Sequence, residues 1–159
     1  MKIITFLGKL KKEKKLGLVE PSLNIEKSYL EKSESNLISS RVLLKVDRLE
    51  EATSLAYYSS YHALLVLLFK VGIKSENHTA SIFLLKNLFD LDNSFISFAK
   101  KERIDKQYYV DFHVTKKDVE ELIIGVEGFN ENLVDFISKL TNEKIKFYRS
   151  KFVSLFEVK

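Results

Sequence analysis

The sequence predicts an all-α fold, namely an up-down four-helix bundle with short extra helices and with N- and C-terminal extensions. Three observations predict it. The chain of 159 residues holds only one proline and five glycines, so few positions interrupt a helix. Apolar residues recur at helical spacing through most of the chain, and no segment alternates convincingly as a strand does. The stretch 63–69 is apolar on every side, so other helices must enclose it.

The composition is that of an ordinary globular protein, with 45% hydrophobic and 30% charged residues. The absence of cysteine excludes disulfides, thiolate metal ligands and a cysteine nucleophile. No histidine has further ligands at metal-binding spacing, so we expect neither a metal nor a cofactor. The apolar run 63–69 is far shorter than the roughly 18 residues that span a bilayer, and no signal peptide is evident. We therefore expect a cytoplasmic protein with no stable membrane insertion.

Positive charge is concentrated in residues 1–20, which we expect to be a basic amphipathic N-terminal arm and linker. Residues 1–15 hold six lysines and one glutamate, whereas the rest of the chain is close to charge balance. The spacing i, i+3, i+4, i+7 of an amphipathic helix is followed by Ile3, Phe6, Leu7 and Leu10. Such an arm packs its apolar stripe on the body or on a second copy, or else contacts a phosphate backbone or a membrane surface.

Residues 21–159 are expected to form a single helical-bundle domain that includes a C-terminal helical extension. Ser22 can cap the first helix, Thr115 and Asp118 resemble a capping box, and Gly72 suits a left-handed C-cap. The predicted helices span residues 23–45, 50–70, 78–89, 95–105 and about 116–140, with the extension continuing at helical spacing from 145 to 156.

Two of these helices carry patterns that predict how they pack. In the first, Leu30, Leu37 and Leu44 repeat every seven residues, which predicts that this leucine face packs in the core. In the last long helix, Gly125 and Gly128 each cost about 1 kcal/mol relative to alanine, so we expect another helix to approach both closely.

The candidate functional side chains are polar groups that a plain apolar core does not need. Tyr58 and His62 lie four residues apart and so share one helix face, and His78 opens a later helix. Arg103 and Tyr108 follow, and arginine with tyrosine suits the binding of a phosphate and a base. The structural alternatives are that the histidines are satisfied interior groups, that Arg103 pairs with a neighbouring carboxylate, and that the aromatic residues close the end of the bundle.

No common catalytic motif is present. The chain has no glycine-rich phosphate loop, nucleophile elbow, zinc-hydrolase helix or acidic metal-binding pair. Whether the protein is an enzyme stays uncertain on this basis, with the balance against catalysis.

Three separated motifs resemble the HEPN domain (higher eukaryotes and prokaryotes nucleotide-binding), in its small stand-alone, nucleotidyltransferase-associated prokaryotic form. They are Ala56-Tyr-Tyr-Ser-Ser-Tyr-His-Ala63, Gly72-Ile-Lys-Ser-Glu-Asn-His78, and Arg103 followed by Tyr108-Tyr109. The resemblance covers about Leu23–Leu140. It implies a helical bundle that often dimerises, and that is often paired with a minimal nucleotidyltransferase or belongs to a toxin–antitoxin system.

Some members of the family are metal-independent ribonucleases that use an Arg-x4-6-His motif. Here Tyr108 stands where that histidine is expected, and the first histidine after Arg103 is His113. A tyrosine with an ordinary pKa near 10 is a poor general base at neutral pH, so the resemblance implies binding roles for Arg103 and Tyr108. A ribonuclease reading would need His62 or His78 as a substitute.

Three hypotheses follow from these residues. The first is a non-catalytic module that binds a nucleotide, an RNA or a nucleotidyltransferase partner through five residues: Tyr58, His62, His78, Arg103 and Tyr108. The second is a ribonuclease toxin that uses Arg103 with His78 or His62. The third is a structural dimeric adaptor, in which the same side chains only fix the helix packing.

Overall fold

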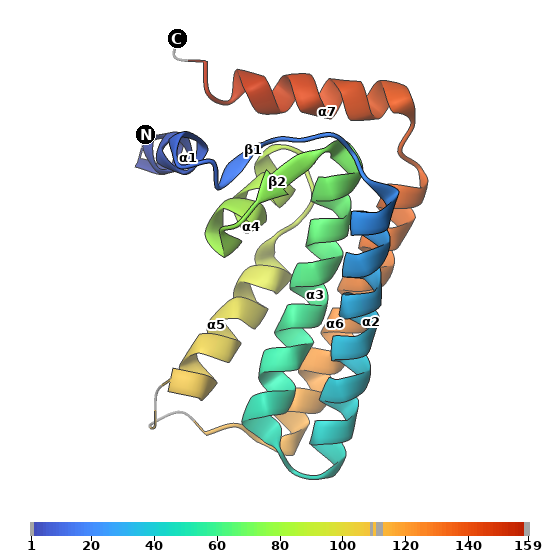
Figure 1. Cartoon of the computed structure of the whole chain (residues 1–159). Coiled ribbons are helices and arrows are strands. Elements are labelled where there is room, and N and C mark those ends of the chain that lie inside the picture. Colours follow the sequence, from blue (N-terminus) through green and yellow to red (C-terminus); the bar gives the residue numbers. More distant parts are fainter. Residues whose placement is uncertain (1, 109, 111–112, 158–159) are drawn as a thin grey trace.

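The computed structural model describes residues 2–108, 110 and 113–157 (Figure 1). The described chain is predominantly helical, which confirms the predicted fold at that level. Its elements are α1 (Lys2–Lys12), β1 (Leu16–Leu18), α2 (Leu23–Lys45), α3 (Leu49–Val71), β2 (Ile73–Ser75), α4 (His78–Asn87), α5 (Ser94–Tyr108), α6 (Lys116–Ser138) and α7 (Asn142–Ser154).

Helix α3 is the centre of the molecule. It contacts α2, α4, α5, α6, α7 and β2, and Figure 1 shows α2, α3 and α6 side by side with α5 on the opposite flank of α3. Leu64, Leu67 and Leu68 of α3 are fully buried. The enclosure that the apolar stretch 63–69 predicts is therefore present.

Small polar residues of α2 and α3 hydrogen-bond across the contact between the two helices, beside partly buried leucines such as Leu37. The Ser33 hydroxyl donates to the Ser59 carbonyl and the Ser59 hydroxyl donates back to the Ser33 carbonyl, each at 2.8 Å. The Ser40 hydroxyl donates to the Ala52 carbonyl at 2.7 Å. Small side chains let the two backbones approach closely, and their hydroxyls satisfy one another across the contact.

The predicted leucine face of α2 is confirmed only in part. Leu37 and Leu44 are partly buried and pack against the core, whereas Leu30 is 37% exposed. The serines beside them, Ser33 and Ser40, are buried. A seven-residue leucine repeat marks a helix face but does not say whether the core or the surface covers it.

A two-stranded antiparallel sheet that the sequence pattern did not predict joins the arm to the body. Leu16 pairs with Ser75 and Leu18 with Ile73. Each strand has only three residues, too few for period-2 alternation to be recognisable. The strands lie next to α1, whose Leu7 and Leu10 are buried in the core, so the apolar stripe of the arm packs on the body of the same chain.

Helix α7 crosses the end of the long helices (Figure 1). Its Arg149 donates from Nη1 to the carbonyls of Val19, Val71 and Gly72 at 2.9, 3.1 and 3.0 Å. Gly72 is the C-cap of α3 with φ +78, as its place in the sequence predicts. One guanidinium thereby ties the C-terminal end of α3 to the segment that follows β1.

Most of the remaining local predictions are confirmed, and one is wrong. Asn77 caps α4 and Thr115 with Asp118 forms the capping box of α6, as expected. At Gly125 an added Cβ would lie 2.4 Å from the Phe95 ring of α5, so the expected close approach is present there. At Gly128 nothing lies within 4 Å, so that expectation is wrong.

No helix in the described part of the chain combines the length and the apolar character needed to cross a membrane.

Candidate functional site

Three helices bring polar and aromatic side chains together on one flank of α3. Helix α3 contributes Tyr57, Tyr58, Tyr61 and His62, helix α4 contributes His78 at its first residue, and helix α5 contributes Lys100 and Arg103. Since i, i+4 neighbours share a helix face, Tyr57 lies beside Tyr61 and Tyr58 beside His62. We call these seven residues the tyrosine–histidine–arginine cluster.

Arg103 is held by tyrosine but not by a carboxylate. Its Nη1 donates to the Tyr58 hydroxyl at 2.9 Å. Its guanidinium carbon lies 5.5 and 5.1 Å from the ring centroids of Tyr57 and Tyr58, within cation–π range. Its Nε is buried, and none of the described residues accepts a hydrogen bond from it.

The structural alternative was that Arg103 pairs with a neighbouring carboxylate. The described residues do not show this pairing. Glu102 forms its ion pair with Lys106 instead, at 3.9 Å. No carboxylate of the described chain lies in ion-pair contact with Arg103. The cationic head of Arg103 therefore sits half-buried without a compensating negative charge.

His78 is fixed on two sides by tyrosines. Its Nδ1 shares a 2.7 Å hydrogen bond with the Tyr57 hydroxyl, and its ring stacks on Tyr61 with 3.7 Å between centroids. Burial is the largest cause and the nearby charges of Arg103 and Lys100 are smaller ones, and together they lower the pKa of His78 to about 4. His78 is therefore a neutral imidazole at neutral pH.

The two tyrosines that hold His78 stay protonated. Burial, the largest cause, raises the pKa of Tyr57 and also the pKa of Tyr61. Lys100 adds a second cationic side chain, and its ammonium donates to the Thr79 hydroxyl at 2.8 Å. Burial, and then repulsion from Arg103, lowers the pKa of Lys100. The cluster thus combines two cations, a neutral imidazole and neutral phenols.

His62 lies at the far side of Tyr58, with 6.2 Å between the ring centroids. The side-chain amide of Asn36 donates to its Nδ1 at 2.9 Å, and Tyr29 stacks on its ring. Burial lowers the pKa of His62, with a smaller contribution from Lys32. Tyr58 therefore stands between the two histidines, since its ring centroid is also 6.2 Å from that of His78.

Tyr108 is a sequence-predicted site residue that the structure does not bring into the cluster. It is the last residue of α5 and is 64% exposed. The sequence predicted an irregular segment from residue 107, but α5 continues through Tyr108. Five residues along an α-helix correspond to about 140° of rotation, so Tyr108 leaves on a different face from Arg103. Its neighbour Tyr109 lies outside the described residues.

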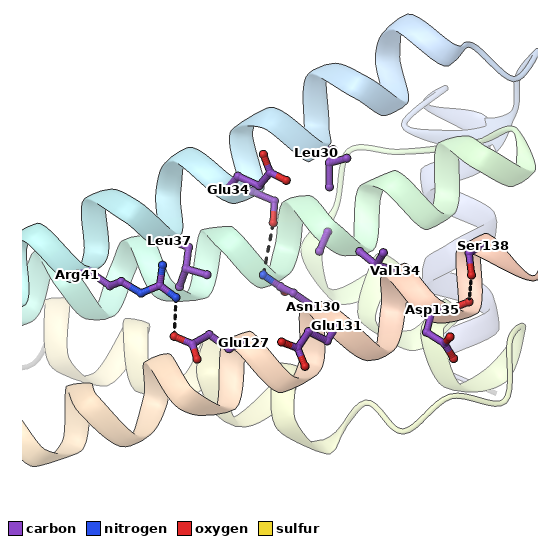
Figure 2. Close-up of a pocket in the computed structure, with 12 residues that line it drawn as sticks. Leu30, Glu34, Leu37, Arg41, Glu127, Asn130, Glu131, Val134, Asp135 and Ser138 are labelled. Carbon is purple, nitrogen blue, oxygen red and sulfur yellow. Dashed lines mark hydrogen bonds and ion pairs between the residues drawn. The ribbon is translucent and has the colours of Figure 1, made fainter.

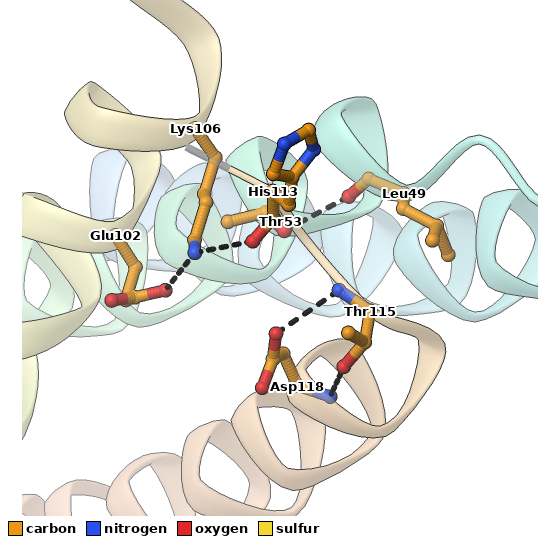
Figure 3. Close-up of polar contacts among 7 residues, drawn as sticks. All are labelled: Leu49, Thr53, Glu102, Lys106, His113, Thr115 and Asp118. Carbon is orange, nitrogen blue, oxygen red and sulfur yellow. Dashed lines mark hydrogen bonds and ion pairs between the residues drawn. The ribbon is translucent and has the colours of Figure 1, made fainter. Parts of the chain in front are cut away.

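His113 is also separate from the cluster. Figure 3 shows the segment 113–115 entering α6, with Lys106 of α5 donating to the His113 carbonyl at 2.8 Å. The Asp118 carboxylate accepts from the Thr115 backbone N–H at 3.0 Å and completes the α6 cap. His113 itself is exposed, so its carbonyl helps to hold the α5–α6 connection while its ring faces outward.

Sequence reasoning brought four of the clustered residues into one proposal and missed three. Tyr58, His62, His78 and Arg103 are brought together, whereas Tyr57, Tyr61 and Lys100 were not singled out. The i, i+4 spacing of Tyr57 with Tyr61, and the i, i+3 spacing of Lys100 with Arg103, are the signals that could have identified them.

The cluster is suited to an anion. Two cations, a histidine and several hydroxyl donors face one region without a carboxylate partner for Arg103 among the described residues. Within the same described part of the chain, no three His, Asp or Glu side chains are grouped so as to hold a metal ion. A separate hollow lies between α2 and α6, and none of the cluster residues lines it (Figure 2).

The helical fold agrees with the result of comparison with known families. A family model described as the HEPN domain matches residues 26–146. Because the match covers most of the chain, the chain belongs to the HEPN domain family. No curated protein matches the chain.

Proposed function

We propose that this protein is a HEPN module that binds the phosphate and base of a nucleotide or of RNA at the tyrosine–histidine–arginine cluster, without cleaving it. The single observation that supports this most is Arg103, a half-buried guanidinium with one tyrosine acceptor and no carboxylate partner among the described residues. Charge-assisted hydrogen bonds to phosphate are among the strongest that arginine forms. Tyr58 is half-buried beside this guanidinium, and its aromatic ring can contact a base.

A binding titration tests this proposal. A fluorescently labelled oligoribonucleotide is titrated with the wild-type chain, with Arg103→Ala and with Lys101→Ala, and AMP serves as competitor. Lys101 is the matched control because it is an exposed cation on the same helix. Loss of a charge-assisted contact worth about 1.5–3 kcal/mol weakens binding at least about tenfold in Arg103→Ala. Equal affinity of wild type and Arg103→Ala would refute the proposal.

A ribonuclease is the second candidate, and one observation favours it. Arg103 and His78 contact the same tyrosine, Tyr57, so a cation and a neutral imidazole lie close together. A neutral imidazole can accept the proton of a 2′-hydroxyl while the guanidinium holds the phosphate. A pKa of about 4 for His78 makes the protonated form scarce at neutral pH, so the general-acid half of the reaction has no good donor.

Growth after induced expression separates the two candidates. A binding module leaves growth unchanged, whereas a ribonuclease toxin arrests it and loses that effect in both Arg103→Ala and His78→Gln. Growth arrest that survives both substitutions contradicts both readings of the cluster.

The assembly predictions belong to the same proposal. We propose that α2, α3, α5 and α6, which run in alternating directions in Figure 1, are the up-down four-helix bundle, and that the chain forms a homodimer or pairs with a minimal nucleotidyltransferase in a toxin–antitoxin system. Sedimentation of the chain alone, and then with the product of a neighbouring nucleotidyltransferase gene, measures both associations. A structural adaptor would form these complexes but would bind neither AMP nor RNA.

A further inference from the structure

A groove of about 580 Å³ lies between α2 and α6, on a different part of the molecule from the tyrosine–histidine–arginine cluster (Figure 2). Its apolar lining includes Leu30 and Leu37 from α2 and Val134 from α6. Leu30 is 37% exposed and Val134 is 50% exposed. The groove therefore presents large apolar side chains that remain partly open to solvent.

The exposed apolar surface continues along α2 beyond the groove. Ile38 is 59% exposed and Val42 is 55% exposed. Single exposed apolar residues are ordinary, but a row of them beside a hollow is typical of a surface that another chain covers.

Carboxylates surround the apolar lining. Glu127, Glu131 and Asp135 follow one another at i, i+4 and i+8 on α6, and Glu34 faces them from α2 (Figure 2). Arg41 is the basic residue of the lining, and its guanidinium is already paired with Glu127. The groove is therefore acidic, although the chain as a whole carries a net charge of +4.

We propose that this groove binds a cationic amphipathic helix of a partner protein. A helix laid between α2 and α6 places its apolar i, i+3, i+4 residues on Leu30, Leu37 and Val134. Its flanking lysines or arginines then meet Glu34 on one side and Glu131 with Asp135 on the other. Complementary charge on both rims fixes the orientation of the bound helix and excludes acidic competitors.

The same charges argue against a second copy of this chain as the occupant. In a twofold-symmetric contact the same patch meets itself, so the carboxylates of one groove would face those of the other. Like charges placed opposite one another in a contact cost free energy instead of contributing it.

Two synthetic helices test the proposal: an amphipathic Leu/Lys helix and a Leu/Glu helix of the same length and apolar pattern. Each is labelled and titrated with the wild-type chain, with Glu34→Lys/Glu131→Lys, and with the control Glu31→Lys/Glu120→Lys. The control makes the same charge change at exposed positions of α2 and α6 outside the groove. Reversing two rim charges turns attraction into repulsion and weakens binding of the Leu/Lys helix about tenfold.

The control variant is expected to bind within about threefold of wild type, since it keeps every groove contact. Val134→Ser is expected to weaken the Leu/Lys helix without changing the charge preference. Equal weakening by the groove and control variants, or tighter binding of the Leu/Glu helix, would overturn the proposal. So would sedimentation of the wild-type chain as a dimer that Val134→Ser dissociates, because a second copy would then occupy the groove.

Discussion

Two partly buried arginines in this protein have opposite surroundings. Arg149 of α7 donates from one nitrogen to three backbone carbonyls, those of Val19, Val71 and Gly72. Arg103 of α5 donates to one tyrosine hydroxyl and keeps a buried Nε that no described residue satisfies. Carbonyls at a helix C-terminus carry partial negative charge, so Arg149 is compensated within the fold. The guanidinium of Arg149 is therefore satisfied within the fold, whereas that of Arg103 is not fully satisfied by the described residues, which is what the proposed anion site requires.

The largest expected effect is at Gly72, because its φ of +78 and its close neighbours both exclude a side chain. An added Cβ would lie 2.1 Å from Arg149 Nη1 and 2.5 Å from the Val19 carbonyl oxygen. Gly72→Ala is expected to lower the free energy of unfolding by about 3 kcal/mol, combining left-handed strain with the displaced arginine. Urea unfolding measures this. A loss of less than about 1 kcal/mol in the free energy of unfolding would mean that Arg149 does not tie the end of α3 to the segment after β1.

Arg149→Ala is expected to lower the free energy of unfolding by about 2 kcal/mol, because it removes the guanidinium donor from the carbonyls of Val19, Val71 and Gly72, of which that of Gly72 keeps the Val19 N–H. Lys146→Ala, an exposed cation on the same helix, is the control and should change the free energy by less than about 0.5 kcal/mol. The same chemical denaturation applies to both. If the two variants are equally stable, the three carbonyl contacts contribute nothing to the fold.

Arg103→Ala is expected to change the free energy of unfolding by less than about 1 kcal/mol, although Arg103 is also half-buried. The lost cation–π contacts and the lost hydrogen bond to Tyr58 are offset by removal of a buried donor that has no partner. A destabilisation as large as that of Arg149→Ala would show that Arg103 is a structural residue. The comparison between the two arginines would then fail.

The smallest effect is a pH dependence that belongs to His78. Its pKa is about 4 in the folded chain and 6.5 ordinarily, so the unfolded chain takes up the proton first as the pH falls. The folded state therefore loses stability as the pH falls from about 6.5 to 4, and this contribution is fully present above that window. His78→Gln should show a shallower decline than wild type in denaturation series across these pH values. Identical declines would mean that His78 titrates normally.

The local signals in this sequence predicted much of the helical framework. Ser22 and Lys45 bound α2 as expected, and Gly72 and the Thr115–Asp118 capping box are where the pattern put them. Such signals act within one or two helical turns, so they can be recognised without knowledge of the fold.

Several of the errors concern contacts between distant segments. The pairing of Leu16–Leu18 with Ile73–Ser75 joins strands far apart in sequence, and three residues are too few to show a pattern. Leu30 of α2 and Gly128 of α6 were assigned to buried contacts, but whether a neighbour covers a face is decided by the packing of other helices.

The candidate site was likewise predicted only in part. Tyr58 and His62 could be paired from their spacing, and Arg103 was recognised from its family motif. Tyr108 was grouped with Arg103 because arginine with tyrosine suits a phosphate and a base, but α5 continues to Tyr108 and leaves it 64% exposed. The spacing of Tyr57 with Tyr61 and of Lys100 with Arg103 was a usable signal, but their contacts with His78 and Thr79 depend on how α4 and α5 pack against α3.

The most direct test of the anion site compares the two arginines in one experiment. In ¹⁵N-labelled protein, the guanidinium Nε–H resonances of Arg103 and Arg149 are followed while AMP is added. The resonance of Arg103 should shift saturably, because the phosphate supplies the acceptor that it lacks, while that of Arg149 stays in place. A titration that leaves Arg103 unmoved, or that moves both arginines alike, would contradict the assignment of Arg103 as the anion-binding residue.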